Sequence, residues 1–341
     1  MEIKKILITG AAGFIGYSLI NRIISDNYDI LGVDNINDYY NVNLKYARLD
    51  DLNIDAHKSK FGEVVVSSKY SNLRFIKLDI TDNKAVDRLL SHEKFDVVIN
   101  LAAQAGVRYS IENPKPYIDT NIVGYFNLLN ASHLNDVKHF IYASSSSVYG
   151  LDNHFPYSEN DQVDSPVSLY GATKKCNELI AHSYSYLYKM HTTGLRFFTV
   201  YGPFGRPDMA PIKFMKAIDE DRTLDVYNEG HLLRDFTYID DIVEGVGKII
   251  KSDVSNRKEI YKIYNIGNSS PVQLMDFIHT MEKIVGKEAK KNYLGMQDGD
   301  IYETYADVSQ LEQDFGFHPS TTLYDGLSKL HDWFKSYKAL L

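Results

Sequence analysis

Hydrophobic and polar positions follow two different periods along the first half of the chain. Short runs rich in β-branched residues predict strands at residues 5–9, 29–33, 73–78, 97–101 and 139–143. Longer segments with apolar residues three or four positions apart predict helices at residues 15–25, 84–91, 117–132 and 172–190. Because strands that alternate with helices are joined by crossovers, the pattern predicts an α/β fold with a doubly wound parallel sheet covered on both faces.

After Met190 the pattern becomes less regular. Residues 193–199 and 260–266 predict strands and residues 239–251 predict a helix, separated by segments that contain Pro and Gly. We therefore expect a first domain at residues 1–202, rejoined by segments near 235–268, and a smaller α/β domain at residues 203–341. Residues 35–68 are too long for a usual crossover and are rich in Asn, Asp and Lys, which predicts a surface excursion.

Composition narrows the class of protein. The 341 residues include 37 Lys and Arg against 45 Asp and Glu, a net charge of −8, whereas a dedicated nucleic-acid binder usually carries a basic surface. A single cysteine excludes a disulfide scaffold and fits the reducing cytoplasm. No stretch approaches the ~18 apolar residues of a membrane span, and the 11 His lack the spacing of metal ligands. We expect a cytoplasmic protein without a membrane anchor, a nucleic-acid partner or a metal.

A glycine-rich segment follows the first predicted strand and leads into a helical pattern. Gly10, Gly13 and Gly16 would allow a tight turn and a close backbone approach to a pyrophosphate, with Phe14 and Ile15 opening the helix whose N-terminus binds the anion. The alternative is an ordinary strand-turn-helix connection. Context favours a dinucleotide site, because other predicted strands end on the same sheet edge.

The residues at those strand ends are the further cofactor candidates. Asp34 would accept hydrogen bonds from an adenosine ribose and repel a 2′-phosphate, which favours NAD over NADP. The remaining candidates are Asn35, Asp79, Ile80, Leu101, Ala102 and Ala103, which should frame the adenine and its ribose.

Three residues suggest proton-transfer chemistry. Tyr170 and Lys174 lie one turn apart at the start of a predicted helix, so their side chains share a face. A phenol has a pKa of about 10, and the charges of Lys174 and of an oxidised nicotinamide would favour the phenolate. Ser145, just past the fifth predicted strand, supplies a hydroxyl that can bridge Tyr170 and a substrate oxygen. With 26 tyrosines in the chain, a chance spacing and a simple polar turn are the alternatives.

These segments resemble the extended short-chain dehydrogenase/reductase family. Residues 34–40, 102–110 and 206–210 are more specifically similar to bacterial UDP-glucuronate 4-epimerases of capsule and lipopolysaccharide pathways. The resemblance covers essentially the whole chain. It implies a Rossmann-type NAD domain, a UDP-sugar-binding C-terminal domain and a homodimer, formed through the helices at 117–132 and 172–190.

The same resemblance implies a role for particular residues. Tyr170 becomes the base, Lys174 its partner and a ribose ligand, and Ser145 the bridging hydroxyl. Arg234 is implied as a pyrophosphate ligand, while Arg206 and Asp300 are implied near the uridine ribose. In the implied reaction Tyr170 takes the proton of the C4 hydroxyl while the C4 hydride passes to NAD⁺, and the hydride returns to the opposite face of the 4-keto sugar.

The turn after Ser145 bears on the substrate. Related dehydratases have Asp and Glu there, whereas this chain has Ser146 and Ser147, whose hydroxyls can donate to a C6 carboxylate without like-charge repulsion. Arg108 and Thr199 are candidates to complete that carboxylate site. The alternative for Arg108 is a surface ion pair with Glu112.

We therefore expect an NAD-dependent isomerase that interconverts UDP-glucuronate and UDP-galacturonate. A 4-epimerase of neutral or N-acetylated UDP-hexoses is the nearest alternative. A non-catalytic NAD-sensing regulator on the same fold is a more distant one, because such proteins often lack the Tyr-Lys pair.

Overall fold

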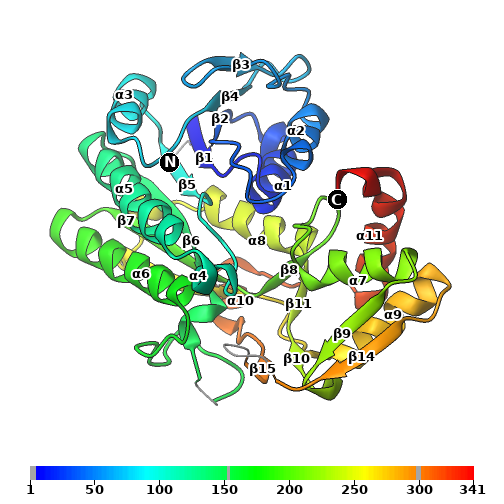
Figure 1. Ribbon diagram of the computed structural model, residues 1–341. Helices are drawn as coiled ribbons and strands as arrows, with labels where there is room; N and C mark the ends of the chain where they lie inside the picture. The colour runs from blue at the N-terminus through cyan, green and yellow to red at the C-terminus, as the bar shows by residue number, and fades with distance from the viewer. Residues whose placement is uncertain (1–4, 152–153, 297–300) are drawn as a thin grey trace.

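An eight-stranded sheet organises the larger part of the molecule (Figure 1). The computed structural model describes residues 5–151, 154–296 and 301–341. Across the sheet the strands run in the order β12 (Tyr261–Ile266), β7 (His191–Phe197), β6 (His139–Ser145), β5 (Val97–Asn100), β1 (Lys5–Thr9), β2 (Asp29–Asp34), β4 (Leu73–Lys77) and β3 (Val64–Val66). All neighbours are parallel except β3, which pairs antiparallel with β4. The doubly wound parallel sheet is therefore confirmed.

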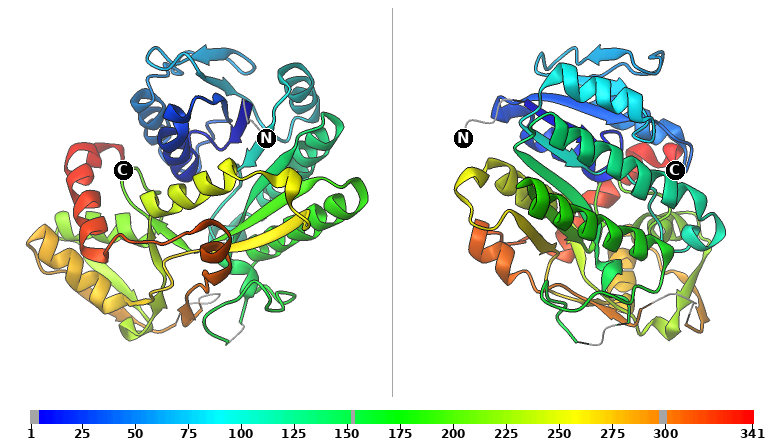
Figure 2. Two further views of the ribbon diagram at one scale, coloured as in Figure 1. Left: turned by 180° about the vertical axis from the view of Figure 1, so that it is seen from behind. Right: turned by 90° about the vertical axis from the view of Figure 1, so that its left-hand side faces the viewer.

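Helices cover both faces of this sheet, because side chains alternate along each strand. From β1, Ile6 and Ile8 enter a core shared with α1 (Phe14–Ile23) and α8 (Ile239–Lys251), whereas Leu7 enters a second core. The second core is shared with α3 (Asn83–Glu93), α5 (Tyr125–Leu134) and α6 (Leu169–Tyr188). Figure 1 shows α3, α5 and α6 in front of the sheet, and the rear view in Figure 2 shows α1 and α8 on the other side.

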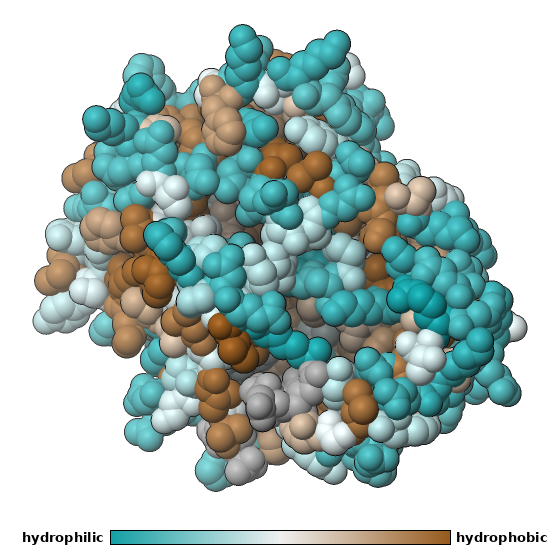
Figure 3. All heavy atoms as spheres, viewed as in Figure 1, coloured by the Kyte–Doolittle hydropathy of each residue, from teal (hydrophilic) through white to brown (hydrophobic). Residues whose placement is uncertain are grey.

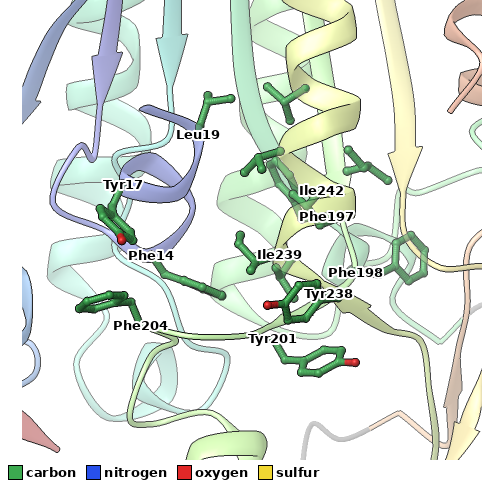
Figure 4. Close-up of a cluster of buried hydrophobic side chains, with 14 of the residues drawn as sticks. Phe14, Tyr17, Leu19, Phe197, Phe198, Tyr201, Phe204, Tyr238, Ile239 and Ile242 are labelled. Atoms are coloured by element: carbon green, nitrogen blue, oxygen red, sulfur yellow. The ribbon is translucent and has the colours of Figure 1, made fainter. Parts of the chain in front are cut away.

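The smaller lobe is built from short strands and helices. It contains α7 (Ala210–Asp219), β9 (Thr223–Tyr227), β10 (Leu233–Arg234), β13 (Val272–Gln273), α9 (Leu274–Val285), β14 (Lys290–Leu294), β15 (Glu303–Thr304) and α11 (Leu323–Tyr337). The intervening α10 (Ser309–Phe315) packs on β12 and α8 of the larger lobe. The two-stranded pair β8 (Thr199–Tyr201) and β11 (Phe236–Tyr238) lies where the chain passes between the lobes. In Figure 4, Tyr201 and Tyr238 lie beside Ile239 of α8, so aromatic side chains fill this junction.

Two predicted elements differ from the observed ones. Residues 35–68 are not a mere surface excursion, because they contain α2 (Val42–Asp51) with Leu44, Arg48 and Leu49 fully buried. Residues 117–132 are one continuous helical segment, but its first part is a π-helix, η2 (Tyr117–Gly124), which runs directly into α5. A π-helix is rare and is often found at a functional site.

The remaining short elements are turns of helix. They are η1 (Ile24–Asp26), α4 (Tyr109–Glu112), η3 (Ser146–Tyr149), η4 (Asn228–Gly230), η5 (Val254–Asn256) and η6 (Lys338–Leu340). Among the described residues, no helix is both long and apolar enough to cross a membrane.

Candidate active site

The glycine-rich turn lies at the point where the strand order of the sheet reverses. β1 sits between β2 and β5, and Gly10 follows β1 with a positive φ of 71°. A Cβ on Gly10 would lie 2.8 Å from the Ala102 nitrogen, and one on Gly16 would lie 2.1 Å from the Gly10 carbonyl oxygen. Only glycine fits this packing, which leaves the start of α1 open to a ligand, as is usual at such a switch point.

Asp34 closes the next strand beside this turn. Its carboxylate accepts hydrogen bonds from the backbone nitrogens of Ala12 at 3.1 Å and Ile36 at 2.9 Å. The buried Lys45 ammonium lies 3.6 Å away, a contact that the sequence analysis missed because Lys45 belongs to the segment taken for a surface excursion. The carboxylate is held in place with lone pairs left for a further donor.

The neighbouring strand ends complete this edge. Asn35 donates to Asp79 at 2.9 Å, and although burial raises the pKa of Asp79, hydrogen bonds from Asn35 and Thr81 outweigh it and lower that pKa. Ile80 is buried against Gly124 of η2. After β5, Leu101, Ala102 and Ala103 are half-buried beside Gly10, with the Ala102 nitrogen donating to Thr9 Oγ1 at 3.2 Å.

Tyr170, Lys174 and Ser145 come together from α6 and β6. Ser168 caps α6 by accepting from the Gly171 nitrogen at 3.0 Å. A Cβ on Gly171 would lie 2.5 Å from the Ser147 carbonyl oxygen, so the start of α6 packs directly on η3. The Lys174 ammonium donates to the Ala143 carbonyl at 2.8 Å and lies 5.9 Å from the Tyr170 ring.

Burial shifts the pKa values of both Tyr170 and Lys174. Burial raises the pKa of Tyr170, while the Ser145 hydroxyl, as a hydrogen-bond donor, and the positive charge of Arg206 oppose that rise. Burial also lowers the pKa of Lys174 to about 8. Lys174, expected to supply charge that favours the phenolate, lies beside the Tyr170 ring, and Arg206 supplies a further positive charge that opposes the rise in the pKa of Tyr170.

Arg206, which the resemblance implies near the uridine ribose, also carries a positive charge that acts on Tyr170. It forms an ion pair with Asp208, with Nε 3.0 Å from Oδ1, and Asp208 accepts from the Tyr39 hydroxyl at 3.1 Å. The rings of Tyr39, Tyr109, Tyr117 and Tyr170 then form a chain of contacts, with centroids 4.9, 6.4 and 6.2 Å apart. Sequence reasoning gave no role to Tyr39, Asp208 or Tyr117, although residues 34–40 and 206–210 carried the more specific resemblance.

Ser146 and Ser147 occupy η3, and both are half-buried. Ser147 accepts from the Ser145 hydroxyl at 3.2 Å. Because Ser145 pairs with Phe197 on β7, Thr199 lies two residues beyond its strand partner, just as Ser147 lies two residues beyond Ser145. Ser145, Ser147 and Thr199 therefore lie at the same edge of the sheet, where β6 and β7 end.

The remaining candidates lie farther apart. Arg108 is exposed, with its guanidinium 5.2 Å from the Tyr227 ring at the end of β9. Arg234 of β10 is half-buried and donates to the carbonyls of Leu233 and Tyr302 at 2.9 and 3.1 Å. Asp300 lies outside the described residues. In the described ranges, no cluster of three or more His, Cys, Asp or Glu side chains could hold a metal ion.

Comparison with known proteins identifies the class. The chain belongs to the NAD dependent epimerase/dehydratase family, whose sequence model matches residues 6–267. Both the predicted family and its cofactor, NAD, are therefore confirmed.

Particular relatives are similar over nearly their whole length. The chain is 50% identical to Protein CapI of Staphylococcus aureus, covering 98% of this chain and 99% of CapI. It is 41% identical to a probable UDP-glucuronate 4-epimerase of Rhizobium meliloti, covering 97% and 96%. A crystal structure of a UDP-glucuronic acid 4-epimerase from Bacillus cereus, in complex with UDP-glucuronic acid and NAD, is 34% identical, with a TM-score of 0.86 and coverage of 97% and 99%.

Proposed function

We propose that this protein is an NAD-dependent UDP-glucuronate 4-epimerase, which interconverts UDP-glucuronate and UDP-galacturonate. The observation that carries the proposal is the side-chain set at the end of β6 and the start of α6. There Tyr170, Lys174 and Ser145 meet, and hydroxyls rather than carboxylates occupy positions 146 and 147. The names of the relatives support the same substrate.

The residues at the sheet edge fit a dinucleotide. The Gly10–Gly16 turn has no room for any Cβ at its tightest points, and Asp34 keeps lone pairs free beside it. NAD, when bound, supplies the acceptor and donor of the C4 hydride. We assign its diphosphate to the start of α1, and its adenosine to Asp34, Asn35, Asp79, Ile80 and residues 101–103. Tyr170 and Lys174 are assigned to its nicotinamide ribose.

Tyr170 is the proposed base for the C4 hydroxyl. Because burial raises the pKa of the phenol, the phenolate needs stabilisation by a hydrogen bond and by positive charge. Ser145 provides the hydrogen bond, Arg206 provides charge, and Lys174, with a pKa of about 8, stays largely protonated at neutral pH. Tyr170 can therefore hold the proton while the 4-keto sugar exists and return it afterwards.

The second domain, residues 203–341, is assigned to the UDP-sugar, and residues 1–202 with the returning segments near 235–268 to NAD. Arg234 and Arg206 would bind the pyrophosphate and uridine end, together with Asp300. Ser146, Ser147 and Thr199 would bind the C6 carboxylate, with Arg108 reaching it from the loop after β5. A 4-keto glucuronate is a β-keto acid, so we further propose that these hydroxyls hold the carboxylate out of alignment with the C4 carbonyl and prevent loss of CO₂.

The dimer is a further part of the proposal. Exposed apolar side chains on the π-helix, α5 and α6 include Ile118, Val123, Phe126, Leu179 and Leu187. Figure 3 has hydrophobic side chains gathered over this part of the molecule. Apolar patches of this kind usually mark an interface, and we assign this one to a second copy of the chain.

We also propose a cellular setting for the protein. The single cysteine supports a cytoplasmic location. The resemblance to capsule and lipopolysaccharide epimerases supports a role in supplying precursors for surface polysaccharide.

One experiment tests the activity. The purified protein is incubated with UDP-glucuronate without added cofactor, and the C4 epimers are separated. Formation of UDP-galacturonate is expected. Turnover of UDP-glucose or UDP-N-acetylglucosamine in preference to UDP-glucuronate would favour the neutral-hexose alternative, and NAD binding without any turnover would favour a regulator.

A further inference from the structure

Arg48 of α2 is fully buried although it carries a charge. Its Nε and Nη2 donate to the carbonyl of Phe204 at 3.2 and 2.7 Å. Its Nη1 donates to the carbonyl of Ala12 at 2.8 Å and to the Tyr40 hydroxyl at 2.6 Å. In the described part of the chain its hydrogen-bond partners are two carbonyls and a phenol, so neutral oxygens rather than a carboxylate hold the guanidinium.

These two carbonyls belong to the two halves of the site. Ala12 lies in the glycine-rich turn, where its nitrogen also donates to Asp34. Phe204 lies two residues before Arg206, on the chain that leaves β8. Figure 4 shows Phe204 beside Tyr17 of α1, and their ring centroids are 4.9 Å apart. Arg48 therefore connects the proposed cofactor turn directly to the segment that carries Arg206.

The conformation of Phe204 requires such support. Its φ is 59°, in the left-handed region that a bulky side chain rarely adopts. Two donors from one planar guanidinium fix the direction of its carbonyl. Without them the backbone could return to an ordinary conformation, and Arg206 would move with it.

A second contact from residues 35–68 acts on the same segment. The Tyr39 hydroxyl donates to Asp208, which is paired with Arg206. The pKa of Tyr39 is raised to about 12, by burial and by the Asp208 charge, so the phenol keeps its proton. The segment 204–208 is thus held at both ends by residues 35–68: Arg48 binds Phe204, and Tyr39 binds Asp208.

We propose that Arg48 is a positioning residue which, through the carbonyls of Phe204 and Ala12, fixes the segment 204–208 and with it the position of Arg206, whose charge acts on Tyr170. The effect on turnover rests on the proposed function. Arg48 itself touches no reacting atom, so it acts only through Arg206.

The test uses the full-length, NAD-loaded protein with Arg48→Met, Arg48→Lys, Arg206→Met and the double variant Arg48→Met/Arg206→Met. Arg74→Met is the matched control, because Arg74 forms ion pairs with Asp29 and Glu93 and tests a loss of stability alone. We measure kcat and KM for UDP-glucuronate, the pH profile of kcat/KM and the unfolding temperature.

Arg48→Met is expected to lower kcat/KM by about 10- to 100-fold, since small displacements of a catalytic group have effects of this size. Arg48→Lys keeps the charge but loses the planar set of guanidinium donors, so its kcat/KM is expected to lie between those of Arg48→Met and the unchanged protein. The groups that face Tyr170 are Ser145, Tyr117, Lys174 and Arg206. Displacing Arg206 raises the pKa of Tyr170, so the acidic limb of the profile should move to higher pH.

The double variant decides the matter. If Arg48 acts through Arg206, adding Arg48→Met to Arg206→Met lowers kcat/KM no further. Three results would overturn the proposal: losses of kcat/KM that multiply in the double variant, an acidic limb of the pH profile that does not move in Arg48→Met, or an equal loss of kcat/KM in Arg74→Met. Binding of UDP, measured by calorimetry on the same variants, requires no turnover. If the unchanged protein fails to epimerise UDP-glucuronate, a loss of UDP affinity that is again non-additive with Arg206→Met still supports the role of Arg48, and an additive or absent loss still refutes it.

Discussion

Arg196 of β7 and Glu178 of α6 form a forked ion pair, with Nε and Nη2 2.9 and 3.0 Å from the two carboxylate oxygens. Both side chains are buried, and Glu178 also accepts from the Ser144 hydroxyl at 2.6 Å. The helix that carries Tyr170 and Lys174 is therefore fastened to the strand that ends in Ser145.

Removing Arg196 should destabilise the fold strongly. Arg196→Met leaves the Glu178 carboxylate buried without its partner, and we expect a loss of about 3–5 kcal/mol in the free energy of unfolding. Urea denaturation measures it. The exposed pair Arg22–Glu244 provides the comparison, since Arg22→Met should cost less than about 1 kcal/mol. Equal losses in both variants would mean that the buried pair has no special weight.

Tyr170→Phe should remove the base and leave the fold intact. We expect the rate of epimerisation to fall by about 10²- to 10⁴-fold, with NAD still bound. Tyr184→Phe is the control on the same helix, because its hydroxyl donates to the Asn130 side chain at 3.0 Å. Full activity in Tyr170→Phe would point to a different base and would revive a regulatory role.

The hydroxyls of Ser147 and Thr199 should protect the 4-keto intermediate from decarboxylation. In Ser147→Ala or Thr199→Ala the C6 carboxylate loses a donor and can align with the C4 carbonyl, so a UDP-pentose should appear beside the epimer. Chromatography of the nucleotide sugars detects it. Ser328→Ala, on the exposed face of α11, should yield none. If epimerisation falls and no pentose forms, the hydroxyls do not have this role.

Acid should destabilise the protein partly through His139. Burial lowers its pKa to about 3, with the charges of Arg257 and His191 adding to the effect, whereas an unfolded His has a pKa of about 6.5. The folded state keeps His139 neutral, so its contribution is present above pH 6.5 and is lost as the pH falls from 6.5 towards 3.

The slope of stability against pH is the measurement for this residue. One group contributes roughly 1.4 kcal/mol per pH unit within that window. His139→Gln, which can still bond Thr193, should flatten the dependence by about that amount. An unchanged slope would show that His139 takes up its proton equally in both states.

The apolar face of α5 and α6 should be the dimer contact. Phe126→Asp and Leu179→Asp place charge on exposed positions of that face and should shift the protein towards monomer in analytical ultracentrifugation. Tyr324→Asp, at an exposed position on α11, should leave the assembly unchanged. If the unchanged protein already sediments as a monomer, the proposed interface is wrong.

The sequence by itself determined what depends on near neighbours. The period of the apolar residues predicted the sheet and its helices because burial on one face imposes that period. Gly10 to Gly16 form one turn, and Tyr170 and Lys174 share one face of a helix, so their spacing alone brought them together. Ser145 was found because it ends a strand.

The tertiary structure decided which distant segments meet. The charge of Arg206 acts on Tyr170, Arg48 binds Phe204 across 156 positions, and Tyr39 binds Asp208 across 169. Periodicity records that a face is buried but not which segment covers it. Residues 35–68 looked like surface because they are polar, yet Arg48 is buried and donates both to Ala12 of the glycine-rich turn and to Phe204, a segment far along the chain. That second contact exists only in the folded molecule.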